Sequence, residues 1–148
     1  MYSVMIVDDD ATSLSITKAL LEDEYDVQIM RSGLQALGYL KDYNDIDIIL
    51  LDMMMPGTDG IKVLKELKED ENLRDIPVIF LTSLDGMNFE AEALTSGASD
   101  FLSKPVHQGL MKLKIQRHLY IAQLKRENRI MKQRLKVIGK VLEDLDLE

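Results

Sequence analysis

Polar side chains that could do chemistry stand at the ends of four short apolar segments of this sequence. Three consecutive aspartates, Asp8 to Asp10, follow the first segment, and a later segment ends on the lone aspartate Asp52. Carboxylates that share one site repel each other and have raised pKa values unless a cation joins them. Hard oxygen ligands of this kind suit Mg²⁺, which binds one or two carboxylates together with phosphate oxygens. The other two segments end on two hydroxyls and an amine, which belong to Thr82, Ser83 and Lys104.

Asp52 stands where a nucleophile toward phosphorus would be needed. It closes an apolar segment and directly precedes residues 53–60, whose proline and glycines are typical of a turn. A lysine and a hydroxyl nearby suit an incoming phosphoryl group, because positive charge and hydrogen-bond donors stabilise its oxygens. The pattern therefore predicts that Asp52 accepts a phosphoryl group beside a metal ion.

Alternating strand and helix patterns place these side chains at one edge of a sheet. Short apolar segments predict strands, and apolar residues at helical spacing predict helices between them. Each crossover between parallel strands needs a helix on a sheet face, so the chain is predicted to be α/β with a parallel sheet. Ligands bind beyond the carboxyl ends of such strands, where the polar residues stand. The expected strands are 3–7, 26–30, 47–50, 76–82 and 100–104, and the expected helices are 12–24, 32–43 with Ser32 as N-cap, 59–70, 88–98 ended by Gly97, and the region from 107 onward.

Four motifs, in the expected order, resemble the receiver domain of bacterial response regulators: MIVDDD, IILLDMMMPGTDG, FLTS and DFLSKP. The resemblance covers residues 2–120 and implies a flavodoxin-like, doubly wound, five-stranded parallel sheet with strand order 2-1-3-4-5. It also implies a two-component phosphoacceptor switch rather than an enzyme. Asp52 would receive its phosphoryl group from a histidine kinase or phosphotransfer protein, with Mg²⁺ present or Mn²⁺ in its place.

The resemblance implies a role for each residue of the expected site. The metal ligands would be Asp8, Asp9, Asp52 and the backbone carbonyl of Met54. The residues that bind the phosphoryl group or respond to it would be Thr82, Lys104 and the switch aromatic Phe101. The supporting residues would be Asp10, Ser83 and Pro105, and the bond between Lys104 and Pro105 is often cis in this family.

The aspartates at 8–10 also allow simpler interpretations. Aspartate is a favoured N-cap, so they could merely begin the following helix. The segment DDDAT also resembles the nucleophile motif of haloacid-dehalogenase-like phosphatases, with Asp8 as nucleophile and Asp10 as acid/base. That family needs a second acidic cluster after its lysine, whereas the next acidic residue beyond Lys104 is Glu127, inside a helical segment. This alternative also leaves Asp52 without a role.

The C-terminal region differs from the rest in charge and in pattern. Residues 1–105 carry 8 basic and 21 acidic side chains, a net charge of −13, whereas residues 106–148 carry 10 and 5, a net charge of +5. Residues 121–148 fit a coiled-coil helix that continues from the last helix of a domain at 1–120, and an asparagine at one a position fixes register in parallel dimers. We therefore expect a parallel homodimer, the alternative being a helix folded back on its own domain. The a and d positions are Ile121, Leu124, Asn128, Met131, Leu135, Ile138, Leu142 and Leu145.

The sequence also argues against nucleic acid and membranes as partners. Basic residues of the tail could contact phosphates, but a complete DNA-binding motif is missing, so nucleic acid is not expected as a partner. The chain has no cysteine, and no signal peptide or apolar run long enough to span a bilayer is recognisable, so we expect a cytoplasmic protein without membrane contact. Receivers joined to cyclic-dinucleotide enzymes often continue through such a helix, which leads us to expect an output domain beyond this chain.

Overall fold

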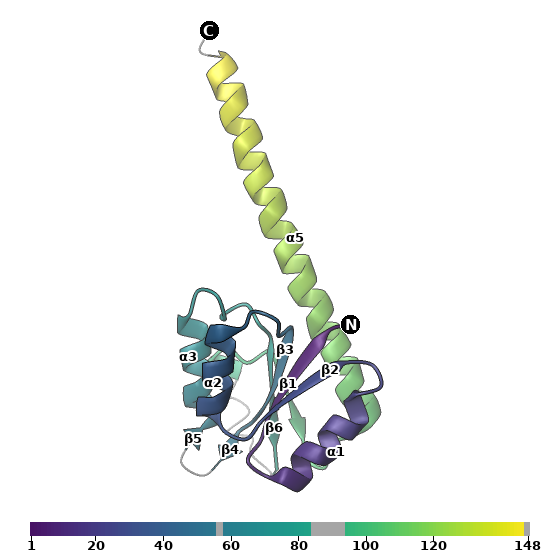
Figure 1. Ribbon diagram of the computed structural model, residues 1–148. Coiled ribbons are helices and arrows are strands. Elements are labelled where there is room, and N and C mark those ends of the chain that lie inside the picture. Colours follow the sequence, from purple (N-terminus) through teal and green to yellow (C-terminus); the bar gives the residue numbers. More distant parts are fainter. Residues whose placement is uncertain (56–57, 84–93, 147–148) are drawn as a thin grey trace.

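The computed structural model describes residues 1–55, 58–83 and 94–146, which form a parallel sheet between helices and one long helix at the C-terminus (Figure 1). The strands of the sheet are β1 (Ser3–Val7), β2 (Asp26–Met30), β3 (Ile48–Asp52), β6 (Val78–Thr82) and β7 (Asp100–Ser103). They lie in the order β2-β1-β3-β6-β7, and every neighbouring pair is parallel. This confirms the α/β fold and the predicted order 2-1-3-4-5, counted over these five strands.

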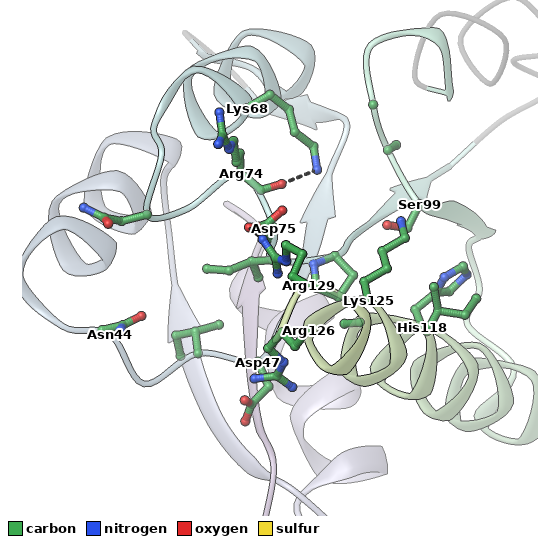
Figure 2. A pocket seen from close by; sticks show the side chains of 18 residues that line it. Asn44, Asp47, Lys68, Arg74, Asp75, Ser99, His118, Lys125, Arg126 and Arg129 are labelled. Atoms are coloured by element: carbon green, nitrogen blue, oxygen red, sulfur yellow. Dashed lines mark hydrogen bonds and ion pairs between the residues drawn. The ribbon is translucent and has the colours of Figure 1, made fainter. Parts of the chain in front are cut away.

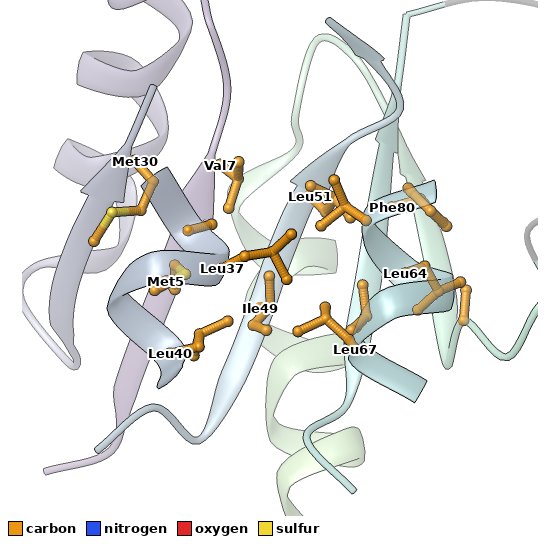
Figure 3. Close-up of a cluster of buried hydrophobic side chains, with 14 of the residues drawn as sticks. Met5, Val7, Met30, Leu37, Leu40, Ile49, Leu51, Leu64, Leu67 and Phe80 are labelled. Carbon is orange, nitrogen blue, oxygen red and sulfur yellow. The ribbon is translucent and has the colours of Figure 1, made fainter. Parts of the chain in front are cut away.

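The helices cover both faces of the sheet (Figure 1). On one face, α2 (Gly33–Asp42) and α3 (Gly60–Glu69) pack against apolar side chains of β1, β3 and β6, as Figure 3 shows. On the other face, α1 (Ala11–Leu21) and the first turns of α5 (Gln108–Asp146) pack against the opposite side chains of the same strands. Strands that are buried on both faces must be apolar throughout, which explains the continuous apolar segments of the sequence.

Short polar side chains begin three of these helices. The carboxylate of Asp10 accepts hydrogen bonds from the backbone N–H groups of Thr12 and Ser13 at the start of α1. Ser32 caps α2 as predicted, and Asp59 caps α3. These bonds satisfy N–H groups that have no partner within the helix, and each cap stabilises its helix by about 1 kcal/mol.

The turn after Asp52 contains a small hairpin that the sequence did not predict. β4 (Met54–Met55) pairs antiparallel with β5 (Thr58–Asp59). Gly60 directly follows this hairpin. A Cβ atom at Gly60 would lie only 2.9 Å from the backbone oxygen of Asp52. Glycine is therefore required for α3 to begin this close to the end of β3. Most of the helix expected at 88–98 lies outside the described residues, and its predicted end, Gly97, has a left-handed φ of 106°.

The last helix, α5, is a single helix of 39 residues, about 58 Å long at 1.5 Å per residue. Its first turns bury Met111, Ile115 and Leu119, and the remainder projects away from the sheet (Figure 1). Arg129 still contacts the domain through Asp75, but Leu135 and Leu142 are 59% and 56% exposed, so the tail beyond Arg129 does not fold back on its own domain. In the described part of the chain, no helix is both long and apolar enough to cross a membrane.

Candidate functional site

Three carboxylates meet at the carboxyl ends of β1 and β3. These strands are neighbours in register, with Val7 opposite Leu51, so Asp8, which follows β1, lies beside Asp52, which ends β3. One oxygen from each of Asp8, Asp9 and Asp52 lies within 4.8 Å of the other two. This arrangement of hard oxygen donors fits a divalent cation such as Mg²⁺.

Burial disfavours the charged forms of the carboxylates in this cluster. Only 1% of Asp8 and 6% of Asp52 is exposed. Burial raises the pKa of Asp52 to about 6, although the N–H of Met54 and the charge of Lys104 act in the opposite direction. Burial also acts to raise the pKa of Asp8, but hydrogen bonds from Lys104 and from the N–H of Asp10 outweigh it and lower the pKa. A pair of carboxylates held this way gains from any further positive charge that reaches it.

Lys104 supplies the one ammonium group that the described residues bring into the cluster. It follows β7 directly, and its Nζ lies 2.8 Å from Asp8 Oδ2 and 3.2 Å from Asp52 Oδ2. Burial acts to lower the pKa of Lys104, but its bonds to the two aspartates raise it overall. Lys104 therefore remains charged beside Asp52, where it can also pair with an oxygen of a phosphoryl group. The peptide bond between Lys104 and Pro105 is cis.

Thr82 places a buried hydroxyl at the same edge. It ends β6, next to the end of β3, where Asp52 lies opposite Leu81. Only 4% of Thr82 is exposed, and its Oγ1 has no hydrogen-bond partner among the described residues. A buried hydroxyl without a partner costs free energy, and an acceptor that arrived at this edge would remove that cost. The neighbouring Ser83 is exposed.

The side chains of two residues of the expected site, Asp10 and Met54, lie outside the central cluster of carboxylates. The carboxylate of Asp10 points to the start of α1 and serves as its cap, so the simpler interpretation of the aspartates holds for this one residue. The side chain of Met54 is 61% exposed, which is compatible with a role for its backbone alone.

Phe101 connects the site edge to the long helix. It lies on β7, is partly buried and packs against the core on the α2–α3 face. The Nζ of Lys114 lies 5.0 Å from the centre of the Phe101 ring and donates a 2.7 Å hydrogen bond to its backbone oxygen. The same lysine and His118, one turn apart on α5, both contact the carboxylate of Asp100, at 3.0 and 2.9 Å. This clamp of Asp100, Lys114 and His118 was not predicted from the sequence, where its one signal is the spacing of four between two basic residues.

Replacing Asp100 by Asn should destabilise the fold by about 2 kcal/mol at pH 7, because hydrogen bonds to charged groups are worth that much. Its contacts with His118 and Lys114 lower the pKa of Asp100 despite its burial. A lowered pKa in the folded state stabilises the protein above the unfolded value of 3.8, and this stabilisation is lost as the pH falls further. Urea denaturation should therefore show a difference between parent and variant that is full at pH 7 and shrinks below about pH 4.

The matched control is Asp23→Asn, which removes the carboxylate from an exposed pair with Lys112. Asp23 has a side chain that is 62% exposed, and such pairs contribute about 0–1 kcal/mol. Equal effects of the two substitutions would show that the Asp100 clamp is an ordinary surface contact.

Comparison with known proteins identifies the family of this chain. The profile of the family described as "Response regulator receiver domain" matches residues 4–116. The chain belongs to this family. The receiver is 44% identical over 105 residues to "Response regulator PleD" of Caulobacter vibrioides, which covers 70% of this chain and 23% of that protein. It is 37% identical over 105 residues to "Polar-differentiation response regulator DivK" of Brucella ovis, over 70% of this chain and 85% of that protein.

Solved structures show the same fold. A response regulator receiver domain protein from Clostridium thermocellum superposes with a TM-score of 0.77 at 28% identity, covering 84% of this chain and 98% of that one. The receiver thus spans about a quarter of the length of PleD but most of the length of DivK. Neither the family match nor the site geometry supports the haloacid-dehalogenase alternative.

Proposed function

We propose that this receiver is a phosphorylation-controlled switch that accepts a phosphoryl group on Asp52 from a histidine kinase or phosphotransfer protein. The observation that carries the proposal is the set of groups around one buried carboxylate. Asp52 lies within 4.8 Å of two further carboxylates and 3.2 Å from the ammonium of Lys104. At the end of the neighbouring strand lies the hydroxyl of Thr82, which has no hydrogen-bond partner among the described residues. Acceptance of a phosphoryl group needs a nucleophile, positive charge and hydrogen-bond donors in this arrangement.

In the proposed reaction, a carboxylate oxygen of Asp52 attacks the phosphorus atom of a phosphohistidine. The bond from phosphorus to the imidazole nitrogen breaks, which leaves an acyl phosphate on Asp52 and a free histidine on the donor. Lys104 pairs with one phosphoryl oxygen, and the hydroxyl of Thr82 donates a hydrogen bond to another. Asp8, Asp9, Asp52 and the backbone carbonyl of Met54 would hold Mg²⁺ or Mn²⁺. Such an ion supplies positive charge against the oxygens of the phosphoryl group.

The conformational change caused by phosphorylation would pass from this edge of the sheet to α5 through β7. A phosphoryl group that bonds to Thr82 and Lys104 biases the ends of β6 and β7, and Phe101 lies on β7 with Lys114 of α5 against it. Ligand or phosphoryl binding shifts a protein between two pre-existing states when it interacts better with one of them. We propose that α5 carries this shift to an output domain.

We also propose that residues 121–148 are a dimerisation helix beyond a switch domain at 1–120. The apolar side chains at the a and d positions range from 37% to 60% exposed in the single chain, and they form one stripe along α5. Leaving such a stripe in water is unfavourable, and pairing it with a second copy would bury it. Asn128 at an a position favours the parallel arrangement.

The experiment that tests the proposed function is uptake of a phosphoryl group from a small donor such as acetyl phosphate. Intact mass should rise by one phosphoryl group when Mg²⁺ is present and remain unchanged when a chelator removes it. Uptake at equal yield without any divalent ion would contradict the proposed metal site. No uptake in either case would contradict the switch itself.

Replacing Asp9 by Ala should lower the affinity for Mg²⁺ about tenfold or more, since even residues behind the metal ligands are worth that factor. The substitution removes one hard oxygen donor and part of the negative field that attracts the cation. Titration calorimetry measures the affinity directly. Asp10→Asn serves as the control, because asparagine caps a helix as well as aspartate does. Equal Mg²⁺ affinities of the parent and Asp9→Ala would contradict the metal site and show that these aspartates serve only to begin α1.

A further inference from the structure

A hollow of about 620 Å³ lies at the edge of the sheet opposite to Asp52. It is enclosed by α3, by the loops that lead into β3, β6 and β7, and by the part of α5 that leaves the domain (Figure 2). Its volume falls within the range of small-molecule sites in proteins, roughly 300–1,000 Å³. No residue of the proposed phosphorylation site lines it.

The lining is strongly basic within a domain that is acidic. Among the described residues, the hollow is lined by two acidic side chains, those of Asp47 and Asp75, against five cations from α3, from the loop before β6 and from α5. Asp75 is already engaged, because its Oδ2 pairs with Nη1 of Arg129 at 2.6 Å, and Asp47 accepts a hydrogen bond from the N–H of Ser3. The five cations are Lys68, Arg74, Lys125, Arg126 and Arg129.

Four of these cations make no ion pair among the described residues, and Lys68 is the most constrained of them. Its stem packs against Gly97, where a Cβ would lie 3.2 Å from Lys68 Cε. Its Nζ donates a 2.9 Å hydrogen bond to the backbone oxygen of Arg74, a neutral acceptor. Burial lowers the pKa of Lys68, and the nearby charge of Lys125 lowers it further, against the opposite effect of Asp75. The fold thus holds a half-buried ammonium beside like charges, which is unfavourable unless an anion joins them.

We propose that this hollow binds a small organic polyphosphate of the size of a nucleoside di- or triphosphate. Guanidinium groups bind phosphate oxygens in pairs, and a lysine adds a point charge, so the lining offers both kinds of phosphate contact. Figure 2 shows that Lys68 points into the hollow from the body of the domain, whereas Lys125 and Arg126 reach it from α5. Arg74 lines the hollow from the loop before β6. A bound polyanion contacts both the body of the domain and α5, and it thereby fixes the direction in which α5 leaves the domain.

The test is titration calorimetry of the full chain with pyrophosphate and with ATP, in the Asp52→Asn background and without divalent metal. One ligand per chain should bind, and Lys68→Gln combined with Lys125→Gln should weaken binding at least tenfold. Lys62→Gln combined with Lys136→Gln removes the same charge from the same two helices outside the hollow, and it should leave the affinity within about twofold. Tighter binding of ATP than of pyrophosphate shows that the ligand is a nucleotide, and equal binding shows that the polyphosphate alone is recognised.

A second measurement separates the hollow from general attraction to a basic tail. The pKa of Lys68, followed by NMR of its ε-methylene group, should rise when pyrophosphate is added to the full chain. Equal loss of affinity in the two double variants, or an unchanged pKa of Lys68 at saturation, would overturn the proposal. So would binding of duplex DNA with no binding of either small probe.

Discussion

Intact-mass analysis of Asp52→Asn is expected to show no phosphoryl adduct after incubation with a small phosphodonor and Mg²⁺, under conditions that fully modify the parent. The side chain amide has nearly the shape of the carboxylate but is not a nucleophile toward phosphorus. Asp8 and Asp9, the nearest other carboxylates, are proposed to hold the metal and are not free to attack. The loss should therefore be complete rather than partial.

Asp26→Asn is the matched control for this loss, because it removes the same charge from an exposed position on β2. It should take up the phosphoryl group at the rate of the parent. Circular dichroism should show both variants folded. A phosphoryl adduct on Asp52→Asn at the yield of the parent would show that another residue is the acceptor.

Replacing Leu135 by Asp is expected to turn a dimer into monomers. Leu135 is 59% exposed in the single chain and occupies an a position at the middle of the seam. A leucine side chain that becomes fully buried contributes about 1.5–3 kcal/mol, and the dimer contains this residue twice. The substitution also forces a carboxylate into an apolar seam, and a buried charge without a partner adds to this loss.

Sedimentation equilibrium of the full chain at tens of micromolar measures this directly. Gln133→Asp introduces the same charge at an f position, on the side of the helix that faces away from the seam, and should remain dimeric. A parent chain with the mass of a monomer would refute the coiled coil. A chain ending near Tyr120 that is dimeric at the same concentrations would place the interface in the switch domain instead.

The sheet could be predicted from the sequence because its strands are buried on both faces. Such strands must be apolar throughout, and all five appeared within two residues of their observed bounds. The hairpin of β4 and β5 could not be predicted, because strands of two residues are too short to show any alternation. The close approach of α3 to β3 also depends on Gly60, whose role becomes visible only once the neighbouring backbone is placed.

The central site could be predicted for a related reason. Residues that directly follow parallel strands must meet at one edge, which brings Asp8, Asp52 and Lys104 together wherever the loops run. The direction of single side chains does not follow from this rule, and Asp10 turns to α1 instead. The clamp between Asp100 and α5 depends on how that helix packs against β7, which local sequence does not determine.

Reduction of the phosphorylated chain with borohydride, followed by peptide mapping, tests the central claim most directly. Borohydride converts an aspartyl phosphate to homoserine, so the reduced residue marks the acceptor. We expect homoserine at position 52, and only in samples treated with both phosphodonor and Mg²⁺. Homoserine at position 8 or 9, or a stable phosphate ester on a serine or threonine with Asp52 unchanged, would contradict a switch built on Asp52.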